Sequence, residues 1–147
     1  MTETTIQGCL DALVAAFRTA LPDSDVIDGP ILQPPSTSDV LTVGYDEDED
    51  TRSVQTERII AGLNSEQESY DIACVASSWS GGTDVKPVRD SAAGMYSTVV
   101  QTLNTDPSVN GAVTRARVSF NTLDQVQAEG GCGVSVRFTI HVDAFVA

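Results

Sequence analysis

VSVRFTIHVDAFV, residues 134–146, alternates apolar with polar side chains, and Phe145 is the one apolar residue at a polar place. A period of two residues is the pattern of a β-strand that has one face on a core and the other in solvent. The segment ARVSFN, residues 116–121, alternates in the same way, and residues 129–131 supply a glycine-rich loop between the two. The sequence therefore predicts a long antiparallel hairpin.

The register of this hairpin follows from the length of its loop. With a three-residue loop, Glu129-Gly130-Gly131, Phe120 lies opposite Ile140 on the apolar face. On the polar face the same register places Arg117 opposite Asp143. A slip of one residue would turn polar side chains into the core, so the alternation determines which residues share a face.

Two segments upstream have the spacing of amphipathic helices. The first covers residues 6–20 and ends before Pro22, which cannot continue a helix. The second begins after Asp84, a residue type that caps helices, tolerates Pro87 in its first turn and runs to about Asn104. Their apolar stripes consist of Ile6, Leu10, Leu13, Val14 and Phe17 in the first helix and of Val88, Ala92, Met95, Val99 and Leu103 in the second.

The remaining apolar and β-branched stretches predict strands, at residues 26–27, 39–45, 54–63 and 66–77, the last two joined near Asn64. WSGGT, residues 79–83, predicts a turn. Helices segregated from antiparallel strands indicate an α+β fold, a mainly antiparallel sheet with two helices packed on one face. We expect a single domain over residues 1–147, in which the other face of the sheet carries charges and small polar groups.

The composition argues against several classes of protein. Twenty-one acidic and eight basic residues give a net charge of −13, which repels DNA phosphates and anionic lipid but suits a channel through which DNA slides. No apolar run is long enough for a membrane span, and we expect no signal peptide because no basic region precedes an apolar run. Cys9, Cys74 and Cys132 stand far apart in apolar stretches, as buried free thiols do in a reducing, cytoplasmic compartment.

No motif predicts catalysis or a cofactor. Ser119 and Asp143 share a predicted sheet face with His141, the one histidine, but a catalytic triad needs a nucleophile on a strained turn beside an oxyanion hole. The cysteines lack the spacing of a zinc site, and the glycine-rich stretches at 80–82 and 130–133 lack the residues of a phosphate-binding loop. We therefore expect no enzyme activity, no catalytic residue, no cofactor and no metal site.

The acidic run Asp46–Asp50 comes nearest to a metal-binding motif. The first, third, fifth and twelfth places of an EF-hand calcium loop are filled by Asp46, Asp48, Asp50 and Glu57. The sixth place is Thr51, where this loop requires glycine, and a strand precedes the run where a helix is needed. We interpret the run as a solvated loop, with weak binding of a divalent ion that modulates association as the alternative.

Several short motifs occur in an order that carries a resemblance. DGP at 28–30 follows the first helix, DVLTVGYD at 39–46 comes next, and ESYDIACV at 68–75 leads to SGG at 80–82. After the second helix come DPS at 106–108 and Gly111, and GVSVRFTI at 133–140 closes the series. Over nearly the whole chain this series resembles the tail terminator proteins of long-tailed, siphovirus-type bacteriophages, the family of lambda minor tail protein U, and particularly those of actinobacterial hosts.

The resemblance implies a structural virion protein. Members of this family form a ring, usually a homohexamer, that caps the tail tube, ends its polymerisation and provides the head–tail joining surface. The implied partners are other copies of the chain, the tail tube protein and the head-closure connector protein, while DNA passes through the lumen without specific binding. The implied location is the head-proximal end of the tail, after assembly in the host cytoplasm, with the Asp46–Asp50 loop and the polar sheet face at assembly surfaces or in the lumen.

Two other classes of function stay open. Another virion component, such as a head-closure protein or a minor tail protein, would share the acidic and ring-forming character. A cellular adaptor or small-ligand-binding α+β protein would instead be monomeric or dimeric and would carry a concave apolar pocket.

Overall fold

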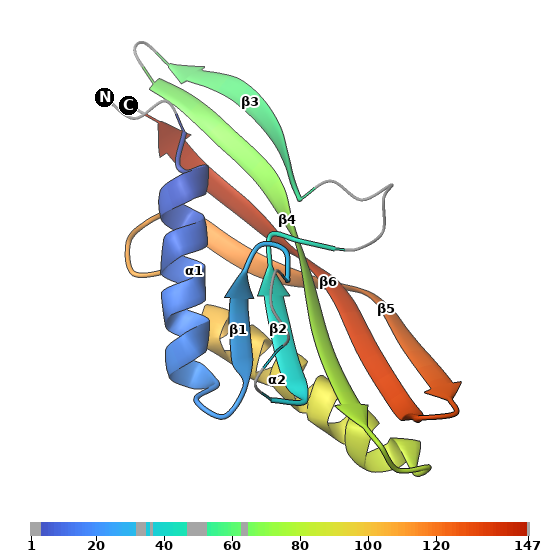
Figure 1. The fold of residues 1–147 in the computed structure, drawn as a ribbon. Coiled ribbons are helices and arrows are strands. Elements are labelled where there is room, and N and C mark those ends of the chain that lie inside the picture. Colours follow the sequence, from blue (N-terminus) through green and yellow to red (C-terminus); the bar gives the residue numbers. More distant parts are fainter. Residues whose placement is uncertain (1–3, 32–34, 36, 47–52, 63–64, 147) are drawn as a thin grey trace.

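A computed structural model describes residues 4–31, 35, 37–46, 53–62 and 65–146. These residues form two helices and a sheet, and the fold is α+β with a dominant sheet, as the sequence predicts (Figure 1). In chain order the elements are α1 (Ile6–Ala20), β1 (Asp25–Asp28), β2 (Asp39–Val43), β3 (Val54–Gly62), β4 (Ser65–Ser80), α2 (Val85–Thr105), β5 (Arg115–Ala128) and β6 (Gly131–Val146).

The sheet is built around two long strands, β4 and β6, which pair along nearly their whole length. The strand order is β1-β2-β4-β6-β5, and β3 pairs with the first half of β4 while β2 pairs with its second half. Only β1 and β2 run parallel; all other described pairs are antiparallel. One edge of the sheet is therefore β5, and the opposite edge is shared by β1 and β3.

Both helices cover the same face of the sheet, because their apolar stripes and the inward side chains of β4 and β6 form one buried cluster. α1 contributes Leu13 and Phe17, and α2 contributes Val99. Full burial of side chains of this size stabilises the fold by roughly 1.5–3 kcal/mol each. The strands supply the facing half of the cluster, which includes Tyr70, Ile72, Cys74, Val136, Phe138, Ile140 and Val142.

The two helices begin in different ways. The Asp84 carboxylate accepts a hydrogen bond of 3.1 Å from the Lys86 N–H, which confirms the predicted cap of α2. The start of α1 is instead held by Glu68 of β4, whose Oε1 accepts from the Thr5 N–H and the Thr5 hydroxyl at 2.8 Å each. Glu68 Oε2 accepts from the Thr4 hydroxyl at 2.7 Å. A fully buried carboxylate therefore lies at the positive end of the helix dipole.

The register of the β5–β6 hairpin differs from the prediction by two residues, although the faces agree. Phe120 lies opposite Phe138 rather than Ile140, and Arg117 lies opposite His141 rather than Asp143. The loop is shorter than expected because Gly131 belongs to β6, and a two-residue loop alone would exchange the faces of β5. A β-bulge between Phe120 and Thr122 adds one residue and restores them.

At Gly131, the first residue of β6, two backbones approach each other closely. A Cβ atom on Gly131 would lie 2.0 Å from the Ser80 carbonyl oxygen, and its φ of 142° is one that side chains rarely adopt. β4 also continues beyond the predicted Ser77, since Trp79, expected in a turn, pairs with Gly133. The Gly133 position leaves room for the Trp79 ring, which a Cβ atom would approach to 2.9 Å.

The buried thiols agree with their sequence pattern. Cys9, Cys74 and Cys132 are fully buried and free. Burial raises the pKa of Cys9 to about 11 and that of Cys74 to about 12, so both stay protonated at neutral pH. In the part of the chain that the structure describes, no helix has the length and apolar character of a membrane span.

Candidate functional site

The face of the sheet away from the helices carries a polar cluster around His141. The Asp71 carboxylate lies 2.6 Å from Nδ1 of His141, and Oδ1 of Asp143 lies 3.4 Å from Nε2. The Ser69 hydroxyl donates to the same Asp143 oxygen at 2.6 Å. This hydrogen bond, together with the His141 and Arg117 charges, holds the pKa of Asp143 below its usual range.

The predicted grouping of Ser119, His141 and Asp143 on one face is confirmed, but its geometry is not that of a catalytic triad. Ser119 lies opposite Thr139 in the register, two pairs along the strands from His141. Both nitrogens of the imidazole face carboxylates, whereas a triad needs one of them on the nucleophile. Asp71 was missing from the sequence-based grouping because the pairing of β4 with β6, which sets it opposite His141, leaves no local signal.

Beside this cluster lies an open basin of about 500 Å³. It is lined mainly by polar side chains, namely Asp71, Arg117, Ser119, Asn121, Thr139 and His141, with Val118 at one side. Asn121, the bulged residue, donates from its amide to the Thr139 hydroxyl at 2.9 Å. The basin is therefore a wet, hydrogen-bonded surface, and among the described residues no group of three or more His, Cys, Asp or Glu is placed to hold a metal ion.

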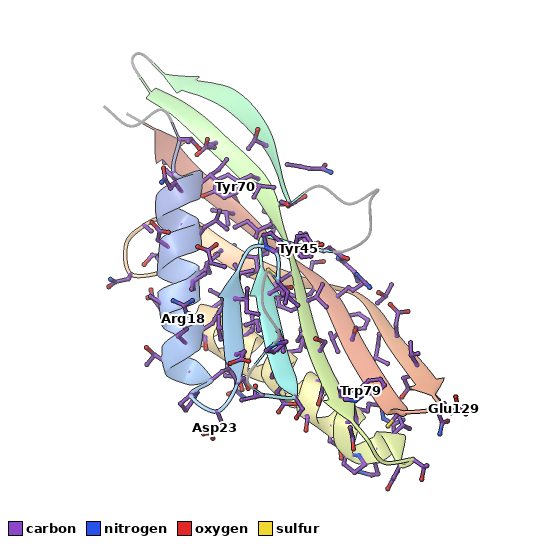
Figure 2. All side chains as sticks on the ribbon, viewed as in Figure 1. Arg18, Asp23, Tyr45, Tyr70, Trp79 and Glu129 are labelled. Carbon is purple, nitrogen blue, oxygen red and sulfur yellow. The ribbon has the colours of Figure 1, made fainter. Side chains whose placement is uncertain are left out.

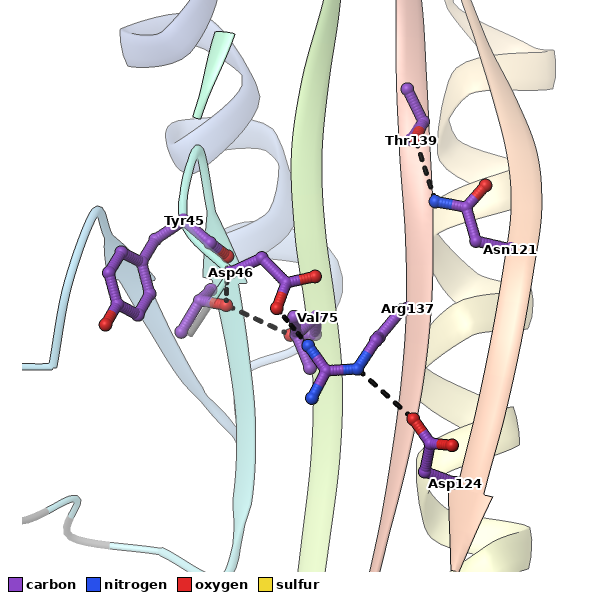
Figure 3. A network of polar contacts seen from close by, with 8 residues as sticks. Tyr45, Asp46, Val75, Asn121, Asp124, Arg137 and Thr139 are labelled. Atoms are coloured by element: carbon purple, nitrogen blue, oxygen red, sulfur yellow. Dashed lines mark hydrogen bonds and ion pairs between the residues drawn. The ribbon is translucent and has the colours of Figure 1, made fainter. Parts of the chain in front are cut away.

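Arg137 ties the beginning of the acidic run to the sheet (Figure 3). Its Nη1 pairs with the Asp46 carboxylate, and its Nε lies 3.2 Å from Oδ2 of Asp124 on β5. The Asp46 side chain is only 7% exposed, so this carboxylate is a structural partner of Arg137. Of the other EF-hand places, Asp48 and Asp50 lie outside the described residues and Glu57 belongs to strand β3, where an EF-hand requires a helix.

Residues Tyr45 and Asp46 lie back over the sheet and cover part of its open face. The N–H groups of Gly44 and Tyr45 both donate to the Ala73 carbonyl, at 2.9 and 3.1 Å, and the Thr42 hydroxyl donates to the Tyr45 carbonyl at 3.2 Å. Ala73 and Val75 are buried although they point away from the helices. The expectation of a wholly polar outer face is therefore wrong at this place.

An apolar groove of about 470 Å³ occupies the other end of the open face. Trp79 is 46% exposed in it, and the lining residues also include Ile31, Val40 and Val126. Trp79 and Glu129 lie near the same end of the long strands (Figure 2), since Trp79 pairs with Gly133 beside the hairpin turn. The sequence does not predict this groove, because WSGGT at 79–83 is typical of a turn and Trp79 instead belongs to β4.

The edge strand β5 exposes three large apolar side chains. Phe120 is 52% exposed, Leu123 38% and Val126 59%. Phe120 rests edge-on against Tyr96 of α2, with ring centroids 5.8 Å apart, and α2 leaves the rest of it uncovered. Within the described residues β5 pairs only with β6, so its other side is open along the strand. Unpaired strand edges that expose apolar side chains are common surfaces for association.

Comparisons with known proteins find likeness in structure and none in sequence. No protein-family model matches the chain, and no curated protein matches it. Among solved structures, a chain titled as the virion of a native gene transfer agent particle is similar over 97% of this chain and 100% of its own length. The TM-score is 0.46 and the sequence identity 10%, and this likeness establishes neither a family nor a function.

Proposed function

We propose that the chain is a structural subunit of a bacteriophage virion, which closes into a ring at the end of a tail tube and stops the growth of the tube. The observation that carries the proposal is the open β5 edge with its exposed Phe120, Leu123 and Val126. Such an edge is a liability for a free monomer, and closure into a ring removes it. The series of motifs that resembles tail terminators supports the same role.

The two edges of the sheet make a head-to-tail contact possible. β5 lies at one edge, while β1 and β3 lie at the other, so the two surfaces are different. A contact between two different surfaces repeats from copy to copy. It closes into a ring when a whole number of copies completes one full turn, as six copies do in a homohexamer. A contact of this kind leaves the two rims of the ring free for other partners. We assign one rim to the tail tube protein and the other to the head-closure connector protein.

The charge of the chain fits the passage of DNA. Each copy carries a net charge of −13, and a ring multiplies this charge around its lumen. A lumen of this sign repels the phosphate backbone and allows DNA to slide through without specific binding. The role needs neither turnover nor a cofactor, and it places the protein at the head-proximal end of the virion tail after assembly in the host cytoplasm.

A polymerisation assay with purified tube protein tests the proposal. Added wild-type chain should give fewer and shorter tubes by electron microscopy, because capped ends no longer grow. A chain with Leu123→Lys and Val126→Lys should leave tube length unchanged, whereas Asp23→Lys, an exposed change beyond α1, should cap as the wild type does. Tubes that lengthen normally with wild-type chain present would refute the proposed role.

One observation favours a second candidate, a binding protein for small apolar ligands. The groove at Trp79 has about the volume of a small-molecule site and is lined largely by apolar residues. Trp79 is the single tryptophan of the chain, so its fluorescence reports on the groove alone. Saturable quenching or a blue shift with a non-fluorescent apolar ligand, in a chain that stays monomeric and does not cap tubes, would favour this candidate.

A further inference from the structure

The bulge at Asn121 divides β5 into two arms whose faces are in opposite phase. In the first arm, Arg117 and Ser119 lie on the open face of the sheet, opposite His141 and Thr139. In the second arm the even-numbered residues take that face, with Thr122 opposite Arg137 and Asp124 opposite Ser135. Val118 and Leu123, opposite Ile140 and Val136, point to the helix side. When the first arm of one copy pairs with the second arm of another copy, open-face residues can therefore lie opposite open-face residues.

We propose that the free chain forms a two-fold dimer, in which β5 pairs antiparallel with β5 of a second copy and Arg117 lies opposite Asp124 of that copy. This register also places Ser119 opposite Thr122 and Val118 opposite Leu123, so every one of these pairs shares a face of the joined sheet. In a strand without the bulge, the same register, with an odd-numbered residue opposite an even-numbered one, would set open-face residues against helix-side residues. A β-bulge usually disrupts strand pairing at the edge of a sheet, but here it makes the edge self-complementary.

The charges of the two arms complement each other. The Arg117 residue is exposed and makes no hydrogen bond or ion pair to another described residue; its charge also helps to lower the pKa of Asp143. The Asp124 side chain is 55% exposed and uses Oδ2 to bind Arg137, which leaves its other oxygen, Oδ1, available to a second cation. Two-fold symmetry makes the Arg117–Asp124 contact twice, and opposite charges across a strand pair stabilise it. The second copy is thus the occupant that the edge fits.

The apolar residues support the same pairing. Val118 and Leu123 meet twice across the two-fold axis, and Phe120, half exposed in the single chain, lies next to the axis on the helix side. Neither a proline nor a lysine stands between Arg115 and Ala128 to block a pairing strand. The dimer would join two sheets into one and would cover the exposed apolar side chains at the centre of β5.

This inference concerns the free protein and does not rest on the proposed ring. A two-fold contact is closed and cannot extend into a ring, so a subunit that uses β5 in a head-to-tail contact must first leave the dimer. The tube-capping assay and the mass of the free protein are separate readouts. The dimer can fail while capping holds, and capping can fail while the dimer holds.

The mass of the free chain tests the dimer by analytical ultracentrifugation or light scattering. The wild type should reach twice the 15.5 kDa of one chain as its concentration rises. Arg117→Asp alone and Asp124→Arg alone should each weaken the dimer roughly tenfold or more, because like charges then meet twice. Asp23→Arg, an exposed charge change near the end of α1 and far from β5 (Figure 2), should leave the dimer unchanged.

Mixing the two single variants gives the decisive result. In a mixed pair, the carboxylate introduced at position 117 of one copy faces the guanidinium introduced at position 124 of the other. The second contact of that pair joins the native Arg117 to the native Asp124, so both contacts regain opposite charges. Native mass spectrometry should therefore detect a heterodimer at concentrations where each variant alone is monomeric. If the copies met through two different surfaces, mixing the variants would not restore two pairs of opposite charges.

Three results would overturn the dimer. The first is a wild-type chain that stays monomeric up to its solubility limit, and the second is full dimerisation of Arg117→Asp. The third is absence of the heterodimer although both variants melt cooperatively. Where Asp124→Arg fails to fold because its new charge lies beside Arg137, the Arg117→Asp chain alone decides: loss of the dimer supports the pairing, and retention refutes it.

Discussion

The two faces of the sheet are stabilised by different interactions, one by apolar packing and the other mainly by hydrogen bonds and ion pairs. On the helix-covered face, Phe138, Ile140 and Val142 are at most 1% exposed and belong to the buried cluster to which both helices contribute. On the open face, between the same residues of the same strand, Thr139, His141 and Asp143 make side-chain hydrogen bonds and ion pairs. The covered face holds the fold together, while most of the open face and the β5 edge stay accessible to solvent.

Truncation of two such neighbouring side chains changes the free energy of unfolding by very different amounts. A buried aromatic side chain leaves a cavity when it is truncated, whereas an exposed polar one is replaced by water. One strand therefore carries alternate positions that determine stability and positions that are free to serve recognition. Each face also holds a buried carboxylate: Glu68 on the covered face, and the side chain of Asp46, paired with Arg137, over the open face.

The largest expected effect tests the contrast within one hairpin. Phe138→Ala should lower the free energy of unfolding by about 3–5 kcal/mol, because it leaves a cavity beneath α2 and removes the ring contact with Tyr96. Ser119→Ala, on the exposed side of the neighbouring strand, should change it by less than about 0.5 kcal/mol. Urea denaturation measures both, and equal effects would contradict the contrast.

The next effect concerns the charge within the covered face. Glu68→Ala should lower the free energy of unfolding by about 2–3 kcal/mol, because Thr4 and Thr5 lose the carboxylate that accepts their hydrogen bonds. Glu68→Gln keeps an acceptor and should cost less. Glu129→Ala, in the exposed hairpin turn, serves as the control and should leave the melting temperature unchanged. A Glu68→Ala chain as stable as this control would show that the carboxylate does not hold α1.

A smaller effect is expected on the covered patch of the open face. Arg137→Ala should cost about 1 kcal/mol, because Asp46 and Asp124 lose a partner that is itself partly exposed. Amide exchange of Gly44 and Tyr45, which donate to the Ala73 carbonyl, should become faster than in the wild type. Unchanged exchange at both amides would mean that Arg137 does not hold this segment on the sheet.

The smallest effect is a titration on the open face. The pKa of Asp143 lies below its usual 3.8, chiefly because Ser69 donates a hydrogen bond to the carboxylate. A pKa lower in the folded than in the unfolded state stabilises the fold above the unfolded value, and the contribution is lost as the pH falls through the folded value. Ser69→Ala should raise the pKa of Asp143 toward 3.8 in an NMR titration. A pKa that does not move would contradict the assigned cause.

The covered face was predictable from sequence because its pattern is long and regular. Ile6–Ala20 forms a helix as its spacing predicts, and Asp84 caps the second helix. Glu68 was missed, although it stands two residues before Tyr70 and so shares its inward face. That position is a usable signal, because a carboxylate on a buried face requires hydrogen-bond partners.

The open face was predictable only in part, because it depends on contacts between strands distant in sequence. The alternation places Ser119, His141 and Asp143 on one face, but Asp71 reaches His141 through the register of β4 with β6. No sequence pattern indicates the bulge at Asn121, because the residues around it on the open face are polar and would look the same in a regular strand. The exposure of Phe120 depends on how far α2 extends over the sheet, which no local pattern contains.

Amide hydrogen exchange across β5 tests most directly whether this edge is the surface on which copies meet. It compares residues 115–128 in the dilute monomer with the same residues in the associated chain, whose mass is measured in parallel. We expect their exchange to slow on association, while the already buried centre of β6 stays unchanged. Association without added protection in β5 would contradict the role assigned to this edge.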